Sequence, residues 1–259
     1  MRDQTILVTG GGSGIGRAVA LLSAARGARV GVMDLDGGAA ETVAVSCQER
    51  GSPAAAALRC DVASEADVTR AFASLAKDLG PPVGLFTSAG VDRGGYAHEL
   101  PLGVWERVLA TNLSGTFLAA RAAIQAMLQS GNGGSIVLCS SPAAFAGFSA
   151  GAASAYTASK GGVSALVRSL AVDYARHGIR VNAVVPGATE TPLMWANVSD
   201  ADRASVEETV RAEVPMGRLA DPEEPARAVL WLLSGDSSYV TGSHLVCDGG
   251  ILAKASISV

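Results

Sequence analysis

Short runs of apolar residues alternate along the chain with longer segments whose apolar positions recur at helical spacing. Such runs are typical of strands buried on both faces of a sheet, and the segments between them are typical of covering helices. The predicted strands cover residues 5–9, 28–33, 55–60, 83–87, 135–139, 179–185 and 244–247. The predicted helices cover about 17–26, 38–50, 64–79, 112–128, 154–176 and 222–233.

This order predicts a doubly wound α/β fold, in which helices cover both faces of a mostly parallel sheet of seven strands. No linker, repeat or low-complexity segment divides residues 1–259, so we expect a single domain. Residues 188–217 are the least regular part of the chain. We expect them to form a loop that closes over a substrate.

Composition narrows the possible partners of this fold. Apolar residues make up 49% of the 259 residues and charged residues 17%, which is enough apolar material for a large core. The net charge is −4 and the basic residues are scattered, so neither nucleic acid nor an anionic membrane is an expected partner. The uncharged stretch between Arg121 and Lys160 is interrupted by polar residues and glycines, so it does not predict a membrane span.

The cysteines and histidines predict no metal site. Cys47, Cys60, Cys139 and Cys247 lack the spacing of metal ligands, and we interpret them as free, mostly buried thiols in a reducing compartment. His98, His177 and His244 are isolated from one another in the sequence. The chain has no apolar leader segment after Met1, and we expect a cytoplasmic protein.

A glycine-rich turn follows the first predicted strand and opens the first helix. It has glycines at positions 10, 14 and 16, and backbone N–H groups in such a turn can face a pyrophosphate. Asp34 ends the second strand, 24 residues after Gly10, where a carboxylate can accept hydrogen bonds from an adenosine ribose. It would repel a 2′-phosphate, and Arg17 is the only cation nearby, so the pattern favours NAD over NADP.

Tyr156 and Lys160 are four residues apart on a predicted helix, so they lie on one face of it. A fixed positive charge beside a phenol makes it a better acid and its phenolate a more stable base. Moving a phenol pKa from about 10 to near neutrality takes roughly 4 kcal/mol of differential stabilisation. As an isolated pair, the two residues could still be a coincidence.

Together these features resemble the short-chain dehydrogenase/reductase family, in its single-domain branch of roughly 250 residues. The resemblance covers essentially the whole chain and implies a Rossmann-like fold. The matching motifs, in chain order, are Thr9-Gly10-x-x-x-Gly14-x-Gly16, Asp61-Val62, Asn112-Leu113-Ser114-Gly115, Tyr156-x-x-x-Lys160, Pro186-Gly187 with Thr191, and Asp248-Gly249-Gly250.

Two departures from the family pattern stand out. Ser88-Ala89-Gly90 replaces the usual asparagine-containing motif, and we expect this to affect sheet stability rather than chemistry. The family serine matches Ser141 better than Ser140, but Ser141 lies 15 positions before Tyr156, two more than is usual. The loop that joins Ser141 to Tyr156 is therefore predicted to be two residues longer.

The resemblance implies a role for each matched residue. Tyr156 would exchange a proton with the substrate oxygen, Lys160 would lower the pKa of Tyr156 and bind the nicotinamide ribose, and Ser141 would stabilise charge on the substrate oxygen. Asn112 would hold a water molecule that links Lys160 to solvent. The predicted cofactor-binding residues are Gly10, Ser13, Gly14, Ile15, Gly16, Asp34, Asp61, Val62, Ser88, Ala89, Gly90, Tyr156, Lys160, Pro186, Gly187, Thr189 and Thr191. The predicted substrate-binding residues are Ser141, Ala143, Tyr156, Met194 and Trp195, with Val91, Phe145 and Phe148 nearby in a largely apolar pocket.

The leading hypothesis is an NAD-dependent oxidoreductase that acts on a small secondary alcohol or ketone. A 3-oxoacyl-carrier-protein reductase that uses NADPH would carry the same motifs, although Asp34 argues against it. A non-catalytic dinucleotide-binding protein is a third reading, which the retained Tyr156 and Lys160 disfavour. The family is usually oligomeric, so a homotetramer or homodimer is expected. Val163, Val167 and Leu170 suit either a subunit interface or packing on the sheet.

Overall fold

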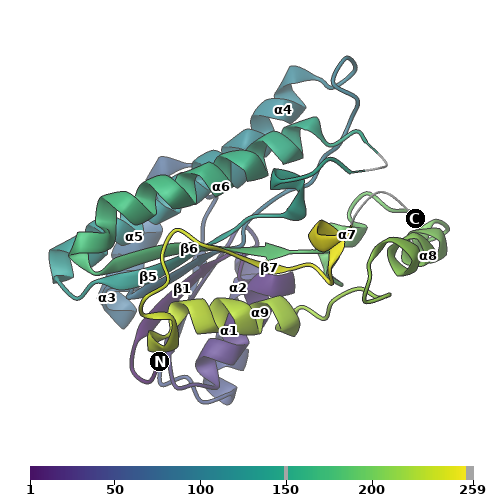
Figure 1. The fold of residues 1–259 in the computed structure, drawn as a ribbon. Helices are drawn as coiled ribbons and strands as arrows, with labels where there is room; N and C mark the ends of the chain where they lie inside the picture. Colours follow the sequence, from purple (N-terminus) through teal and green to yellow (C-terminus); the bar gives the residue numbers. More distant parts are fainter. Residues whose placement is uncertain (149–150, 255–259) are drawn as a thin grey trace.

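The computed structural model describes residues 1–148 and 151–254, and within them the strands form one parallel sheet (Figure 1). The strand order is β3-β2-β1-β4-β5-β6-β7, and each neighbouring pair is parallel. The strands are β1 (Thr5–Thr9), β2 (Arg29–Asp34), β3 (Ala55–Arg59), β4 (Gly84–Thr87), β5 (Gly134–Cys139), β6 (Ile179–Pro186) and β7 (His244–Cys247). The predicted doubly wound fold and its seven strands are confirmed.

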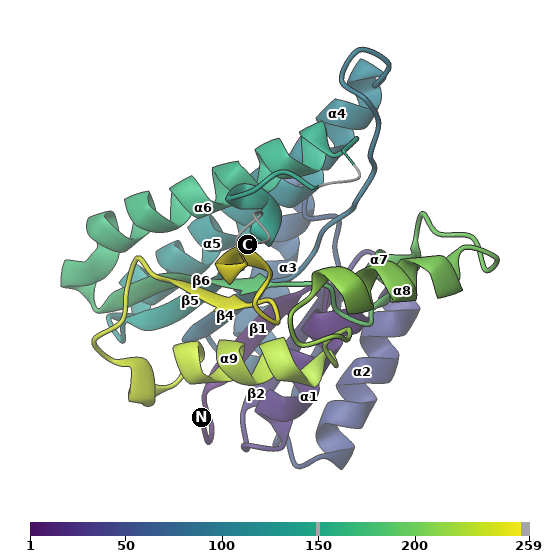
Figure 2. The same cartoon turned by 45° about the vertical axis from the view of Figure 1, so that its right-hand side comes forward.

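Helices pack on both faces of this sheet (Figures 1 and 2). One face carries α3 (Glu65–Leu79), α5 (Gly115–Ser130) and α6 (Ser154–Tyr174), and the other carries α1 (Gly14–Ala24), α2 (Gly37–Glu49) and α9 (Glu223–Leu233). Strands with a helix layer on each side are buried on both faces, which explains why β1 is a continuous apolar run buried along its whole length.

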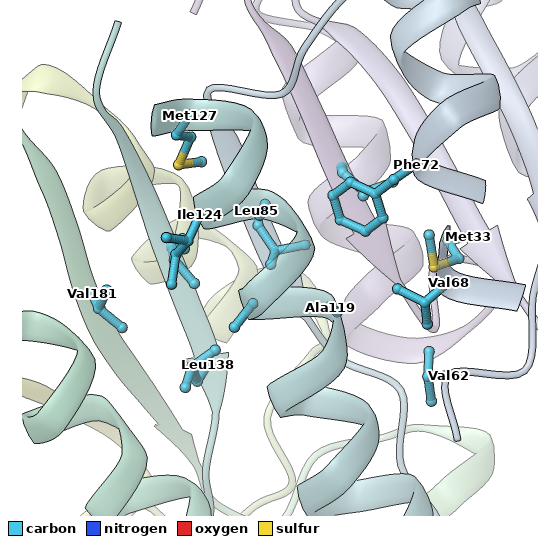
Figure 3. Packing of buried hydrophobic residues seen from close by; sticks show 14 of the residues in the cluster. Met33, Val62, Val68, Phe72, Leu85, Ala119, Ile124, Met127, Leu138 and Val181 are labelled. Atoms are coloured by element: carbon cyan, nitrogen blue, oxygen red, sulfur yellow. The ribbon is translucent and has the colours of Figure 1, made fainter. Parts of the chain in front are cut away.

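The larger core cluster lies between the sheet and α3, α5 and α6. Figure 3 shows part of it, including Ile124 of α5, Leu85 of β4 and Leu138 of β5. Val163 and Val167 of α6 are fully buried in the same cluster, and Leu170 is 8% exposed. The sequence left two roles open for these three residues, a subunit interface or packing on the sheet. The structure shows that they pack on the sheet.

Local signals in the sequence account for most element boundaries. At the start of α3, Ser64 caps the helix, because its hydroxyl accepts a hydrogen bond from the Asp67 N–H. The four cysteines are free thiols, as predicted, with Cys47 and Cys60 buried and Cys139 and Cys247 partly buried. Across residues 1–148 and 151–254, no helix combines the length and apolar character needed to cross a membrane.

Two regions differ from the prediction. The helix expected to begin at Asn112 is preceded by α4 (Leu102–Leu109) and a π-helical turn (Ala110–Ser114), so helical structure begins ten residues earlier. α4 has only eight residues, which is shorter than the window of about 11–18 residues over which helical periodicity can be recognised in a sequence. The irregular segment 188–217 contains α7 (Pro192–Trp195) and α8 (Arg203–Glu213). α8 buries a single residue, Val210, which explains why its pattern was missed.

The strand order places the chain's chemistry at one edge of the sheet. β1 lies between β2 and β4. The next two strands along the chain, β2 and β3, lie on one side of β1, and β4 to β7 lie on its other side. In open parallel sheets, the carboxyl ends of the strands beside this reversal form a crevice that binds ligands. The predicted motifs follow the carboxyl ends of β1, β2, β3, β4, β5 and β6, and so meet at this edge.

Candidate active site

A cavity of about 1030 Å³ opens at the carboxyl edge of the sheet. Its wall is built from the turns after six of the strands and from segment 188–217. Most residues predicted from the motifs lie in this wall: Gly10, Ser13, Gly14, Ile15, Asp34, Asp61, Val62, Ser88, Ala89, Gly90, Ser141, Tyr156, Lys160, Pro186, Gly187, Thr189, Thr191 and Met194. The cavity is large enough for a dinucleotide end and a small substrate end.

The glycine turn lets two pieces of backbone approach each other at the floor of the cavity. Gly10 has a φ of +63°, and a Cβ atom there would lie 2.6 Å from the Ala89 nitrogen. A Cβ on Gly16 would lie 2.1 Å from the Gly10 carbonyl oxygen. Both positions therefore require glycine. The helix α1 that follows has no side-chain cap at Ser13, so N–H groups of its first turn are left to face a pyrophosphate.

Asp34 stands at the other side of this turn, at the end of β2. Its Oδ2 accepts a hydrogen bond from the Gly12 N–H at 2.9 Å, and its Oδ1 accepts one from the Asp36 N–H at 3.0 Å. These bonds hold the carboxylate in the cavity wall, and each oxygen keeps a lone pair for a further donor. A Cβ on Gly12 would lie 2.9 Å from Oδ2 and would fill the space beside it. The residues present thus fit the ribose end of a nicotinamide dinucleotide.

Ser141, Tyr156 and Lys160 meet at the far end of the cavity. The Ser141 side chain hydrogen-bonds the Tyr156 phenol, and the Lys160 Nζ lies 5.6 Å from the centre of the Tyr156 ring. Lys160 is 6% exposed and donates a hydrogen bond to the Cys139 carbonyl oxygen at 2.8 Å. The neighbouring Ser140 is turned away, with its hydroxyl 2.7 Å from that of Ser164.

The pKa of Tyr156 is set by two opposed effects. Removal of the phenol from water raises its pKa, and this is the larger effect. The Lys160 charge lowers the pKa of Tyr156, as expected from the sequence, and the hydrogen bond from Ser141 lowers it further. Together, these effects raise the pKa of Tyr156 above its ordinary value. The predicted lowering of this pKa is therefore not produced by the protein groups alone. Burial cannot be read from the spacing of two residues, and this explains the difference.

Asn112 lies in the π-helical turn and is fully buried. Its Oδ1 accepts from the Val91 N–H at 2.8 Å, and its Nδ2 donates to the Val91 carbonyl oxygen at 2.9 Å and to the Ser159 hydroxyl at 3.1 Å. Ser159 in turn donates to the Tyr156 carbonyl oxygen at 2.7 Å. Asn112 therefore connects the loop after β4 to the first turns of α6. Both of its amide hydrogens are used in this way, and its predicted role as a water holder stays a prediction.

Five predicted residues lie outside the cavity wall. Gly16 supports the turn from behind, Asn112 is buried beneath the wall, and Ala143 is 1% exposed with its N–H bonded to the Ser141 hydroxyl. Trp195 points elsewhere, because its Nε1 donates to Glu190 at 2.6 Å and the Arg203 guanidinium lies 5.1 Å from its ring centre. Phe145 is the fifth, whereas Val91 and Phe148 are in the wall. The substrate contacts expected of Trp195 and Ala143 stay predictions.

The sequence analysis missed several wall residues. Asp92 follows Val91 in a loop without a motif, and Asn197 belongs to the segment between α7 and α8. Cys139 immediately precedes the two strand-end serines and could have been found by extending that motif by one residue. The loops that carry Asp92 and Asn197 have no regular pattern, so only the folded structure brings them to the cavity.

Known proteins share this fold and have similar sequences. A family model described as enoyl-(acyl carrier protein) reductase matches residues 10–252. The chain is 38% identical over 254 residues to 2-(S)-hydroxypropyl-CoM dehydrogenase 3 of Xanthobacter autotrophicus, with 98% of each chain covered. The chain belongs to the short-chain dehydrogenase/reductase family.

Further similarities agree with this assignment. The chain is 41% identical over 254 residues to a 2,5-dichloro-2,5-cyclohexadiene-1,4-diol dehydrogenase of Sphingobium indicum, which covers 98% of both chains. The structure of the present chain matches that of a short-chain type dehydrogenase/reductase from Mycobacterium marinum with a TM-score of 0.92 and 34% sequence identity. The match covers 98% of this chain and 97% of that one. Members of the short-chain dehydrogenase/reductase family use nicotinamide dinucleotides, and this chain is an oxidoreductase that acts on CH–OH groups.

The network around Asn112 predicts a difference between two buried substitutions. Asn112→Ala leaves the N–H and carbonyl groups of Val91 without their partner, and we expect a loss of about 2–4 kcal/mol in the free energy of unfolding. Ser159→Ala removes one hydroxyl from the same network and should cost about 1 kcal/mol. Urea titration of the two variants beside the wild type measures both values. Equal stability of the two variants would show that Asn112 does not hold the loop as described.

Proposed function

We propose that this chain is an NAD-dependent dehydrogenase that transfers a hydride between nicotinamide and a small secondary alcohol or ketone. The observation that carries the proposal is the arrangement of Ser141, Tyr156 and Lys160 at one end of a cavity whose other end is the glycine turn with Asp34. An acid/base group, a hydrogen-bond donor and a buried cation converge where a reacting oxygen would lie.

Each of these groups has a distinct task in the proposed reaction. In ketone reduction the Tyr156 hydroxyl gives its proton to the substrate oxygen, and in alcohol oxidation the Tyr156 phenolate takes that proton back. Ser141 donates a hydrogen bond to the same oxygen and stabilises negative charge that develops on it. Lys160 stabilises the phenolate through its charge. The bound cofactor supplies the hydride acceptor in oxidation and the hydride donor in reduction.

The cofactor is held by residues along the length of the cavity. The N–H groups at the start of α1 would bind the pyrophosphate, Asp34 the adenosine ribose, and Asp61 with Val62 the adenine. Thr189 and Thr191 line the cavity and would contact the nicotinamide, and Thr191 also caps α7 by accepting from the Met194 N–H at 3.3 Å. Lys160 keeps two ammonium hydrogens beyond its bond to Cys139, and these can reach the nicotinamide ribose.

The preference for NAD over NADP rests on the charges around Asp34. The cavity wall at this end contains Asp34, Leu35 and Asp61, and Arg17 is exposed on α1 outside the wall. Arg59, the neighbour of Asp34 across β2 and β3, is likewise not among the wall residues, so a 2′-phosphate would first meet the negative charges of Asp34 and Asp61. This charge pattern also weighs against the NADPH-dependent 3-oxoacyl-carrier-protein reductase reading. The homo-oligomeric state and the cytoplasmic location stay predictions from the sequence.

Removing the Tyr156 hydroxyl tests the proposed acid/base role. We expect Tyr156→Phe to lower kcat by about 10²–10⁴-fold, because the group proposed to transfer the proton is lost. The dissociation constant for NADH, measured by fluorescence titration, should change by less than about threefold. Tyr174→Phe on the same helix is the control and should keep its turnover. Retained turnover in Tyr156→Phe would exclude the assignment.

Exchanging the carboxylate at Asp34 tests the cofactor choice. Wild-type protein should oxidise secondary alcohols with NAD in clear preference to NADP. Asp34→Ser should weaken NADH binding about tenfold, because a charged acceptor for the ribose hydroxyls is lost. It should also raise the NADP-to-NAD ratio of kcat/KM by about 10–100-fold, because the carboxylate no longer repels the 2′-phosphate. Asp36→Ser is the control, since Asp36 caps α2 and lies outside the cavity wall. A wild-type preference for NADPH would contradict the role given to Asp34.

A further inference from the structure

Asp92 lies in the wall of the cavity at the same end as Ser141 and Tyr156. Its negative charge raises the pKa of Tyr156, and the Lys160 charge lowers the pKa of Asp92. The three groups are therefore close enough to sense one another electrostatically. None of the motifs includes Asp92, and the reaction proposed above does not use its carboxylate.

Three separate segments fix the position of Asp92. The preceding residue, Val91, is bonded through both its N–H and its carbonyl group to Asn112. Downstream, the Gly95 N–H donates to the Ala152 carbonyl oxygen at 2.6 Å. From segment 188–217, Asn197 Nδ2 donates a hydrogen bond to the Asp92 backbone carbonyl oxygen at 2.7 Å. Such an arrangement holds one side chain at a defined place in the wall.

The longer loop between Ser141 and Tyr156 takes part in this arrangement. Gly95 forms an isolated parallel bridge with Ala153, which directly precedes α6. A Cβ on Gly94 would lie 2.4 Å from the Ala152 carbonyl oxygen, so the two segments are in close contact. The loop that departs from the family pattern thus supports the segment that carries Asp92.

The Asp92 carboxylate has no hydrogen-bond donor among residues 1–148 and 151–254, whereas its backbone carbonyl has one. Partial burial raises the pKa of Asp92, because the charged form loses part of its hydration. A half-buried acceptor without a donor is costly, and a donor on a ligand relieves that cost. The neighbouring wall residues Val91, Phe148 and Met194 are apolar and cannot supply one.

We propose that Asp92 selects substrates with a second hydroxyl group close to the reacting carbon, so that the enzyme's substrates are diols and hydroxyketones. The proposal rests on the proposed function and specifies the substrate class of the same site. While Ser141 and Tyr156 bind the reacting oxygen, the second hydroxyl donates its hydrogen bond to the Asp92 carboxylate. A cationic amine could also pair with Asp92, but it would lie beside the Lys160 ammonium and be repelled.

The test compares two probes with the same carbon skeleton, cyclohexane-1,2-diol and cyclohexanol. Wild-type protein should show a kcat/KM for the diol about 10–100-fold above that for cyclohexanol, the range expected for a hydrogen bond to a charged group. In Asp92→Ala this ratio should fall toward one, and Asp92→Asn, which keeps an acceptor oxygen, should restore part of it. Asp200→Ala is the control, because Asp200 is an exposed residue of segment 188–217 that lies outside the cavity wall.

A wild-type ratio near one, or a ratio unchanged by Asp92→Ala, would overturn the proposal. If neither probe is turned over with NAD or NADP, the proposed function fails, and ligand-observed NMR decides the substrate class on its own. The ratio of the two dissociation constants should then still favour the diol in wild-type protein and be lost in Asp92→Ala. Equal binding of the two probes would reject the role of Asp92.

Discussion

The buried ammonium of Lys160 is the interaction on which the rest of the site depends. A charge that is 6% exposed is costly unless protein groups replace the water it has lost. Here the Cys139 carbonyl oxygen at the end of β5 accepts one hydrogen bond, and the nearby Asp92 carboxylate supplies opposite charge. This placement requires α6 to lie against the end of β5, and the packing of Val163 and Val167 on the sheet provides it.

The same charge controls what Tyr156 can do. Removal from water raises the pKa of the phenol, and the charge of Lys160 is the largest of the effects that lower it. Ser141 adds a hydrogen bond in the same direction, and Asp92 acts in the opposite one. An oxidised nicotinamide carries a positive charge, and when bound near Tyr156 it would act in the same direction as Lys160. The site thus combines a desolvated acid with a balance of charges around it.

Much of this arrangement could be predicted from the sequence because it depends on local patterns. The strands of a sheet covered on both faces are apolar runs, and the strand-end motifs must meet at one edge because the strands are parallel. α4 was missed because a helix of eight residues is too short for its apolar periodicity to be recognised. The position of the Trp195 side chain outside the cavity wall could not be predicted, because its direction depends on contacts with Glu190 and Arg203.

The residues that could not be predicted are those whose role arises from tertiary contacts. Asp92 reaches the cavity only because segments near residues 112, 152 and 197 converge on its loop. The structural role of Asn112 likewise became visible only with its three partners in place. The net direction of the Tyr156 pKa depends on burial, which two residues four apart do not reveal.

We propose that the site transfers a hydride directly between a carbinol carbon and nicotinamide. Incubating the enzyme with NAD and cyclohexane-1,2-diol deuterated at both carbinol carbons tests this step, because NMR of the reduced cofactor then locates the label. We expect deuterium at C4 of the nicotinamide ring. If the hydrogen added at C4 comes from the solvent instead, direct hydride transfer is excluded.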